Sequence, residues 1–529
     1  MPRENPTIDC TVDIDFLTTT DGRMSVRETL MQAHKPGFHI ARTIPAYFYT
    51  AQIRLLTAIL AVALRYGDLS NRRIAAKLRT TGLPAEAIDE ALEKLRPATY
   101  LHHEKFPFMQ RPAVNTTNPK EKASFVGPGE QPVKKLSPSM PPDNAEDFWN
   151  LLKAPSERLR LEDAVLQLVV YHHMSLAGNN AYCGDKCVSG SPAMRFVGAE
   201  NSATEILWHG ENLLETLLCM IPVSWVEGSG LPAWADRACS QSRGEHGSPH
   251  ALWSATWTSN SPATAWDGSE LVGVRTGGIP SEWYLPEMRD NAKDWWTARN
   301  EADPFYLYSD NGKELKLQRL DLGKDATALA TNWAAENKTA IYKDWCAPRM
   351  VPPSEHMQLL FARHRMEGTA SSPNIRASEI FLPSFENWAH DTDIDVQLRI
   401  SSGASQIEKL HRAVIAPFRR ENSSERKGGR VPLVLDFLHD SRGSASDAFW
   451  RHMSHVFSLL LKECRESGAQ FIPSSELRSG MIKGSVDAFD EITTPYFGQE
   501  PARISHVRAG LERQVHKIAR DFASPQYDQ

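Results

Sequence analysis

Residues 45–64 read PAYFYTAQIRLLTAILAVAL, and this stretch organises the first part of the fold. Apolar residues occupy most positions at helical spacing, which predicts a helix that is buried on several sides. The longest apolar run, Leu55–Leu64, is about half of the ~20 residues that a bilayer-spanning helix requires. We therefore expect a core helix inside a large domain, and no membrane-spanning segment.

The composition indicates a globular protein with more than one domain. The chain has 529 residues, of which 41% are hydrophobic and 23% charged, and its formal net charge is −6. A chain of this length usually forms two or more domains of roughly 100–200 residues each. The mild acidity argues against a protein that coats nucleic acid through bulk charge, but it allows contact through a few residues inside an assembly.

The cysteines and the N-terminus indicate a reduced, cytoplasmic protein. Seven cysteines, an odd number, are spread from Cys10 to Cys464, which is not the disulfide framework of a secreted protein. The first residues, MPRENPTIDCTVD, carry acidic side chains early and lack the apolar core of a signal peptide.

On either side of residues 45–64 the pattern mixes strands and helices. Residues 8–16 alternate between apolar and polar, and Asp21-Gly22 is a turn signal, so we predict a small hairpin followed by a helix that Ser25 caps. Helical spacing recurs in three further segments: residues 83–95, 161–174 and 202–220. Residues 223–350 are rich in Trp and irregular, with short strand-like pieces at 305–308 and 313–320.

From about residue 386 the pattern is almost wholly helical. Segments 404–420, 445–466 and 503–523 place apolar residues three and four positions apart. We predict an α+β fold with two domains. Residues 1–385 form a large mixed, mostly helical domain with short strands, and residues 386–529 form a C-terminal four-helix bundle.

Two long loops interrupt the N-terminal domain. Residues 111–149 are rich in Pro, Gly, Asn and Lys, and residues 175–194 read SLAGNNAYCGDKCVSGSPAM. Loops this long are usually functional or disordered. Basic runs in loops are most often solvated surface, but they also follow a phosphate backbone. The weak candidates for such contact are Lys120, Lys122, Arg419, Arg420, Arg426 and Lys427.

Signatures of common enzyme sites are absent from the sequence. It contains no G-x-x-x-x-G-K-[ST] loop, no G-x-S-x-G, no H-E-x-x-H and no C-x-x-C. The pairs His390-Asp391 and His439-Asp440, with His102-His103 and His172-His173, leave open a metal-dependent phosphohydrolase of the HD type. The alternative is chance, because 18 histidines produce adjacent pairs and neighbouring helical residues point about 100° apart.

Four cysteines also raise the question of a zinc site. Cys183 and Cys187 lie four positions apart, and Cys219 and Cys239 follow them. This is not the spacing of a zinc ribbon or knuckle, so we interpret them as structural cysteines and predict no metal.

Residues 100–110 read YLHHEKFPFMQ, and a Lys/Pro loop with a K-L-x-P core at Lys135–Pro138 follows. With the apolar helix before them, the Gly/Asn loop at 176–192 and AFWRHM at 448–453, these motifs resemble the CasA-type large subunit of type I-E CRISPR Cascade complexes. The likeness covers nearly the whole chain through the order of its features. It departs at Val12–Phe16, which reads VDIDF where the family usually has Trp-Ile-Pro-Val.

The resemblance implies a non-catalytic subunit without cofactors. In this family a guide RNA pairs with the target, while the large subunit recognises a short flanking motif (the PAM) of duplex DNA through the minor groove and helps to open the duplex. The implied partners are a guide-RNA complex with its backbone and small subunits, double-stranded target DNA, and a helicase–nuclease that docks on the large subunit. No membrane partner is implied.

Three elements of the family meet the flanking DNA. A glycine loop corresponds to residues 181–185, for which an ordinary connecting loop is the alternative, and a basic finger corresponds to Lys293 or its rival Arg289. A wedge on a short hairpin corresponds to residues 367–371, which lack the customary Gln. The residues expected to contact DNA are Tyr182, Cys183, Gly184, Asp185, Lys293, Gly368, Thr369 and Ala370.

The loop around residues 133–144 corresponds to the family's first-loop element, which lies near the 5′ end of the guide and the neighbouring backbone subunit. We expect disorder there in the free chain and ordering upon assembly. The residues implied are Val133, Lys134, Lys135, Leu136 and Pro138. Two other functions stay open at this point, namely the HD-type phosphohydrolase and a helical scaffold that binds only protein.

Overall fold

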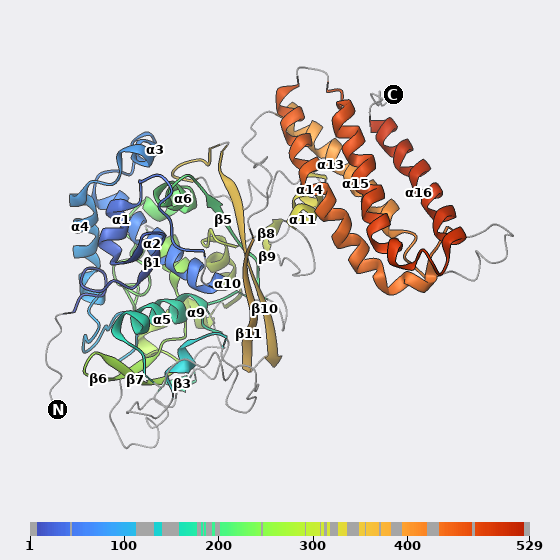
Figure 1. The fold of residues 1–529 in the computed structure, drawn as a ribbon. Helices are drawn as coiled ribbons and strands as arrows, with labels where there is room; N and C mark the ends of the chain where they lie inside the picture. Colours follow the sequence, from blue (N-terminus) through green and yellow to red (C-terminus); the bar gives the residue numbers. More distant parts are fainter. Residues whose placement is uncertain are drawn as a thin grey trace. The chain divides into compact units, whose positions relative to one another are not determined.

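The computed structural model of the chain separates into two compact units (Figure 1). Unit 1 comprises Met1–Arg319, Asp344–Pro353 and Leu359–Phe381, and unit 2 comprises Leu320–Lys343, Ser354–Gln358 and Leu382–Gln529. The structure describes residues 8–42, 45–112, 132–139, 158–176, 181–182, 185–186, 193–195, 202–244, 247–290, 292–306, 308–310, 315–317, 326–335, 349–354, 356–369, 372–381, 394–420, 433–467 and 471–522.

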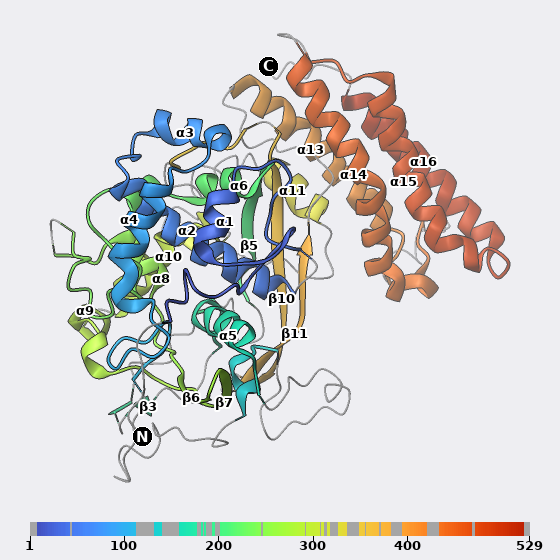
Figure 2. The same cartoon turned by 60° about the vertical axis from the view of Figure 1, so that its left-hand side comes forward.

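Helix α2 (Ala46–Tyr66) is the central helix of unit 1, as the apolar pattern predicted (Figure 2). It packs against three helices, α4 (Ala85–Leu95), α5 (Leu161–Met174) and α6 (Leu213–Met220). By length and composition alone α2 could cross a membrane, but 94% of its most apolar window is buried inside the protein. Protein neighbours therefore surround α2, which behaves as the core helix of unit 1.

The N-terminal segment of unit 1 is a hairpin and a capped helix, as predicted. Strands β1 (Leu17–Thr19) and β2 (Gly22–Met24) pair antiparallel, and Gly22 at the turn has a φ of 112°, which favours glycine. Helix α1 (Val26–Gln32) begins after Ser25, whose hydroxyl accepts a hydrogen bond from the Glu28 N–H at 3.2 Å. This bond satisfies one of the free N–H groups at the start of the helix.

A three-stranded sheet forms one side of unit 1. Strands β10 (Gln358–Thr369) and β11 (Ser372–Phe381) form a long hairpin, and β5 (Glu205–His209) pairs with the other edge of β10. The predicted helix at residues 202–220 is therefore wrong in its first half, which is β5. Only α6 is helical, because Asn212 caps its first turn by accepting from the Glu215 N–H.

The rest of unit 1 consists of short elements. The structure describes helices α3 (Arg72–Thr81), α7 (Val223–Val226), α8 (Ala251–Thr256), α9 (Pro286–Asp290) and α10 (Ala292–Glu301), together with hairpins of β3 (Ala181–Tyr182) with β4 (Asp185–Lys186), β6 (Ala263–Asp267) with β7 (Glu270–Arg275), and β8 (Tyr308–Asp310) with β9 (Leu315–Leu317). The strand-like piece predicted at 313–320 thus contains β9, whereas β8 begins only at the last residue of the piece predicted at 305–308.

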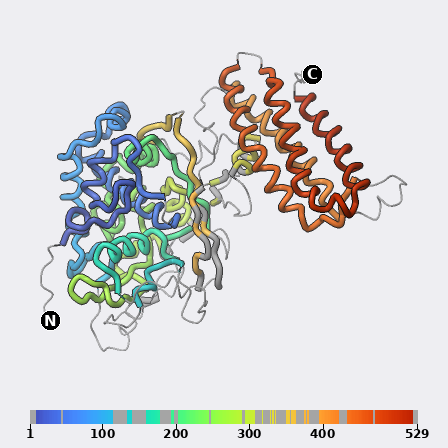
Figure 3. The backbone as a smooth tube through the Cα atoms, in the orientation of Figure 1, coloured from blue at the N-terminus to red at the C-terminus, as the bar shows by residue number. Residues whose placement is uncertain are grey.

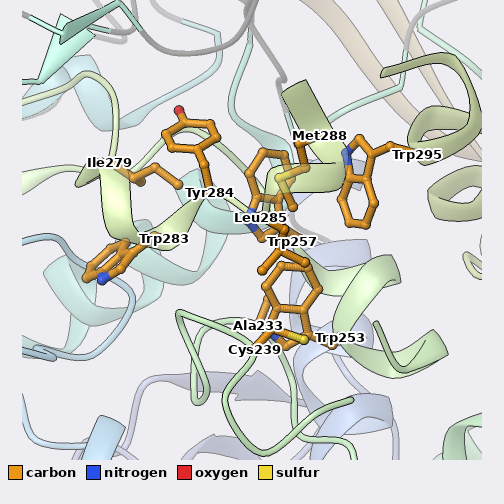
Figure 4. Close-up of a cluster of buried hydrophobic side chains, with 10 residues drawn as sticks. All are labelled: Ala233, Cys239, Trp253, Trp257, Ile279, Trp283, Tyr284, Leu285, Met288 and Trp295. Atoms are coloured by element: carbon orange, nitrogen blue, oxygen red, sulfur yellow. The ribbon is translucent and has the colours of Figure 1, made fainter. Parts of the chain in front are cut away.

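A cluster of aromatic side chains holds α8, α9 and α10 together (Figure 4). Trp295 of α10 lies edge-on to Trp253 and Trp257, with ring centroids 5.9 and 5.6 Å away. Arg299, one turn further along α10, donates from Nε and Nη2 to the Trp257 carbonyl at 3.1 and 2.6 Å. The Trp-rich middle of the chain is thus a packed core that fixes the position of α10.

Unit 2 is a helical bundle, as predicted (Figure 3). Its long helices are α13 (Ile394–Ile415), α14 (Arg442–Glu466), α15 (Ser475–Thr493) and α16 (Pro501–Phe522). Helix α11 (Ala326–Ala335) packs against α13 and α14, and Ser401 donates to the Ala335 carbonyl. Residues 320–343, which the sequence analysis left in the first domain, therefore belong to unit 2.

Candidate nucleic-acid interface

The predicted glycine loop lies on the β3–β4 hairpin. Tyr182 and Asp185 face each other across the two strands, so the connection between them consists of Cys183 and Gly184, which lie outside the described residues. Two-residue hairpin connections require backbone angles that favour glycine, so Gly184 suits this position. The two described ends of the predicted loop thus belong to a hairpin, and its contact with DNA stays a prediction.

The predicted wedge lies where the β10–β11 hairpin turns. Gly368 and Thr369 are the last residues of β10, Thr369 pairs with Ser372, and Ala370 with Ser371 forms the connection outside the described residues. The hairpin is longer than expected, with strands of 12 and 10 residues. The register shifts between Arg365 and Met366, which marks a bulge part-way along it.

Buried polar residues anchor the base of this hairpin. His364 of β10 lies opposite Ser378 of β11, and its two ring nitrogens lie 3.0 Å from the Ser378 hydroxyl and 3.3 Å from the Glu205 carboxylate. Since a carboxylate only accepts, Nε2 donates to Glu205. The Ser202 hydroxyl also donates to the His364 carbonyl at 3.1 Å.

Glu205 continues this network into the core of unit 1. Arg54 of α2 pairs with Glu205 at 2.7 Å and with Asp303 at 3.1 Å, and Arg195 lies 3.4 Å from Asp303. Burial opposes ionisation of Glu205, but Arg54 and His364 outweigh it and lower the pKa of the carboxyl to about 2. The hairpin is therefore tied to the central helix through charges that water does not screen.

The segment of residues 132–139 is folded and packs against the same hairpin. Val133–Leu136 form a 3₁₀ helix in which Val133 and Leu136 are buried, while Lys134 and Lys135 stay partly exposed. The Pro138 carbonyl accepts a hydrogen bond from the Ile375 N–H of β11 at 2.8 Å. The expectation of disorder is therefore wrong for residues 133–139, whereas residues 140–144 lie outside the described residues.

Lys293 is the second residue of α10, and Arg289 lies four positions earlier in the chain, in α9; the structure describes the backbone of both. The tryptophan cluster fixes this pair of helices. Arg419 and Arg420 follow α13 in unit 2, where Arg420 lies 3.3 Å from His439. The predicted residues outside the described part are Lys120, Lys122, Cys183, Gly184, Ala370, Arg426 and Lys427.

The candidate metal ligands do not assemble in the described part of the chain, where no group of three or more His, Cys, Asp or Glu residues could hold an ion. His439 contacts its neighbour Asp440 and the Asp436 carbonyl. His172 lies 3.1 Å from the Thr256 carbonyl, and burial followed by nearby Arg237 lowers its pKa to about 3. His390-Asp391, Cys183 and Cys187 lie outside the described residues.

The motif that carried the resemblance is structural. Phe108 and Met109 are fully buried, and Gln110 donates from Nε2 to the Leu101 carbonyl at 3.1 Å. The Gln110 carbonyl accepts from Arg237 Nη2 at 3.2 Å. Pro-Phe-Met-Gln therefore joins the end of the first helical layer to the Trp-rich middle of unit 1.

The sequence analysis missed the residues that anchor the hairpin. Arg54, Glu205, Asp303 and His364 lie far apart in sequence, and no local spacing connects them. One signal was present, because a single arginine inside the apolar stretch 45–64 requires a buried acidic partner.

Comparison with known proteins gives the following matches. Residues 17–261 match the sequence model of the family described as CRISPR-associated protein Cse1. The structure of Thermobifida fusca Cse1 is 15% identical, with a TM-score of 0.64 over 98% of this chain and 99% of that one. The structure of Thermus thermophilus CasA (Cse1) is 16% identical, with a TM-score of 0.60 over 98% of this chain and 100% of that one. The structure of Acidimicrobium ferrooxidans Cse1 is 14% identical, with a TM-score of 0.60 over 98% of this chain and 99% of that one. No curated protein sequence matches the chain.

Residues 17–261 are thus similar in sequence to CRISPR-associated protein Cse1. The chain as a whole has the fold of the solved Cse1 (CasA) structures.

Proposed function

We propose that this chain is the large subunit of a type I-E Cascade, and that it recognises the flanking motif of a duplex target and helps to open the duplex. Similarity to a chain of a solved CRISPR RNA-guided surveillance complex supports this, at 15% identity and a TM-score of 0.61 over 97% of this chain. The observation that carries the proposal is that unit 1 contains all three predicted DNA-contacting elements, two of them at two-residue hairpin connections.

Each element has a defined physical task. The connection at Cys183–Gly184 brings backbone close to base edges in the minor groove, where small residues allow near approach. Lys293 supplies a positive charge to the flank. The tip at 368–371 enters the first base pair, which costs a few kcal/mol per unstacked step and requires a rigid base under the hairpin. The Arg54–Glu205–His364 network supplies that base.

The partners follow from the same assignment. Lys134 and Lys135 face the guide-RNA complex near its backbone subunit, the bundle of unit 2 contacts the small subunits, and the chain as a whole receives the helicase–nuclease. The chain itself carries out no chemistry, binds no cofactor and acts in the cytoplasm. Arg419 and Arg420, with Lys120, Lys122, Arg426 and Lys427, add weak contacts to the nucleic-acid backbone.

The test is duplex binding by the assembled guide-RNA complex, with and without this chain. The target carries either its flanking motif or a scrambled flank, at one stated salt concentration. We expect the chain to lower the Kd for the intact flank alone, and Gly184→Asp to abolish that gain. The matched control is Gly268→Asp, at the two-residue connection of the β6–β7 hairpin, where an added Cβ meets no atom within 4 Å.

Two results would contradict the proposal. If the chain changes the Kd of neither duplex, it does not recognise a flank, and a protein-binding scaffold becomes the better description. If the purified chain holds a stoichiometric divalent metal at a His–Asp pair, the phosphohydrolase alternative replaces the proposal.

A further inference from the structure

Tyr47, at the start of α2, contacts both the 132–139 segment and the β10–β11 hairpin. Its hydroxyl lies 3.1 Å from the Ser139 hydroxyl, and its backbone N–H donates to the Ser378 hydroxyl at 3.2 Å. Ser139 is also 3.0 Å from the Ser137 hydroxyl. The side chain of Tyr47 is buried, with 5% exposed. A single residue of the core helix therefore joins two elements that lie far apart in sequence.

A second contact between these elements is direct. The Ile375 N–H of β11 donates to the Pro138 carbonyl, and both residues are buried. Among the described strands β11 is an edge of the sheet β11-β10-β5, and Pro138 satisfies a donor that β10 does not reach.

The direct contact lies next to the bulge. Arg365 pairs with Ala377 and Met366 with Ile375, which leaves Arg376 as the extra residue. A strand bends at a bulge, so the hairpin needs support just beyond this point if its tip is to keep one direction. Pro138 contacts Ile375, the first paired residue on the tip side of the bulge.

The other side of the bulge is fixed independently. His364 and Ser378 lie opposite each other, and His364 reaches Glu205, whose carboxylate pairs with Arg54. Ser378 links this anchored base to Tyr47. The hairpin thus has a rigid base at His364 and one described support beyond its bend, at Pro138.

We propose that residues 137–139 form a brace that sets the direction of the distal half of the β10–β11 hairpin, with Tyr47 as its anchor. The inference rests on the proposed function, in which Lys134 and Lys135 face the guide-RNA complex and the hairpin tip opens the duplex. Docking of the 132–139 segment then fixes the tip through Ser139 and Pro138. Tyr47 and Ser139 are positioning residues, because they act on the tip without touching DNA.

The test compares Tyr47→Phe, Ser139→Ala and the double variant in the assembled complex. The target carries 2-aminopurine at the first base pair beyond an intact flank, and its fluorescence gives the rate of opening. Each change removes the Tyr47–Ser139 hydrogen bond, and Ser139→Ala also removes the one to Ser137, so we expect opening to slow about 3- to 10-fold. The double variant should be no slower than the slower single variant, because both changes remove the same bond.

Two controls separate positioning from binding and folding. Tyr496→Phe makes the same chemical change in unit 2 and should open the target at the wild-type rate. The Kd of Tyr47→Phe for a target whose first base pairs are already unpaired should equal that of the wild type, because the brace acts only on opening.

Hydrogen exchange of the free chain tests the brace without DNA. We expect the Ile375 amide to exchange about 5-fold faster in Ser139→Ala and Tyr47→Phe than in the wild type, because its support loosens. Unchanged exchange overturns the brace, whatever the DNA assay shows. If the Ile375 amide exchanges faster but the duplex opens at the wild-type rate, the brace exists but has no role in opening. If the wild-type complex does not distinguish the intact from the scrambled flank, the proposed function is wrong instead.

Discussion

The guanidinium of Arg54 and the carboxylate of Glu205 lie 2.7 Å apart inside unit 1, with 8% and 1% of their side chains exposed. Asp303 lies 3.1 Å from the same guanidinium, so one cation faces two buried acids. Neither acid can be hydrated where it lies, so each needs a cationic partner; Arg54 pairs with both, and Arg195 also pairs with Asp303. This relationship connects the central helix α2 to strand β5 and, through His364, to the β10–β11 hairpin.

Arg54→Met should strongly destabilise unit 1. The variant leaves Glu205 and Asp303 buried with much less compensation, and breaking a buried pair by removing one partner costs about 3–5 kcal/mol. Urea denaturation followed by far-UV circular dichroism measures the loss. The matched control is Arg27→Met, which removes an ion pair with Asp89 at 2.6 Å on the surface. Solvent screens that pair, so we expect a cost below about 1 kcal/mol; equal costs for the two variants would contradict the assignment.

The stability of unit 1 should fall as the pH is lowered below neutrality. Burial and Arg237 lower the pKa of His172 to about 3 in the folded chain, whereas an unfolded histidine titrates near about 6.5. Between these values the unfolded state binds the extra proton, so the contribution of His172 is fully present above about pH 6.5 and is lost as the pH falls towards 3.

His172→Gln tests this assignment, because it replaces the ring by a group that does not titrate and can still donate to the Thr256 carbonyl. We expect the free energy of unfolding to depend less steeply on pH between 6 and 4, by up to about 1.4 kcal/mol per pH unit. His103→Gln, which makes the same change at a partly exposed histidine, is the matched variant for comparison. Identical slopes for wild type and His172→Gln would show that folding does not lower the pKa of His172.

Gly403→Ala should destabilise the bundle of unit 2. A Cβ at Gly403 of α13 would lie 2.4 Å from a methyl group of Leu460, which is fully buried on α14. Overpacking of this kind costs about 1–3 kcal/mol and outweighs the helix propensity of alanine. Gly443→Ala on α14, where an added Cβ meets no atom within 4 Å, should instead be neutral or stabilising. Thermal unfolding distinguishes the two, and a stabilised Gly403→Ala variant would contradict the close packing of α13 on α14.

Trp295 and Trp296 are adjacent on α10, but replacing each by alanine should destabilise the protein to a different extent. Trp295 is buried in the aromatic cluster, so Trp295→Ala should cost about 3–5 kcal/mol. Trp296 only packs against the edge of the cluster, so Trp296→Ala should cost less than about 2 kcal/mol. Amide exchange over α10 should rise in the first variant alone, because Trp295 fixes the helix that bears Lys293. Equal exchange in both variants would show that the cluster does not hold α10.

The sequence correctly predicted those helices and strands whose buried residues recur at a regular spacing. The spacing of Phe449, Met453 and Phe457 marks the buried face of α14, and Ser25 marks the start of α1. The pattern failed for β5, where Glu205–His209 has a spacing that also suits a helix. Pairing with β10, about 150 residues later in the chain, determines that these residues are extended. The sequence predicted which segments form the candidate site, but it did not predict the buried residues that anchor the β10–β11 hairpin.

The sequence by itself determined that α2 is buried, that the C-terminal third is a helical bundle, and where the two long loops and the Pro-Phe-Met-Gln motif lie. Only the tertiary structure decided that Arg54 meets Glu205 and Asp303, that Gly368 and Thr369 end one strand of a long hairpin, and that Pro138 and Tyr47 contact this hairpin. The physical reason is range. The apolar residues on one face of a helix recur every three or four positions, so a short stretch of sequence reveals them. The partner of a buried charge or of an edge-strand N–H lies within about 3 Å in space but far away in the sequence, so only the packing of distant segments determines it.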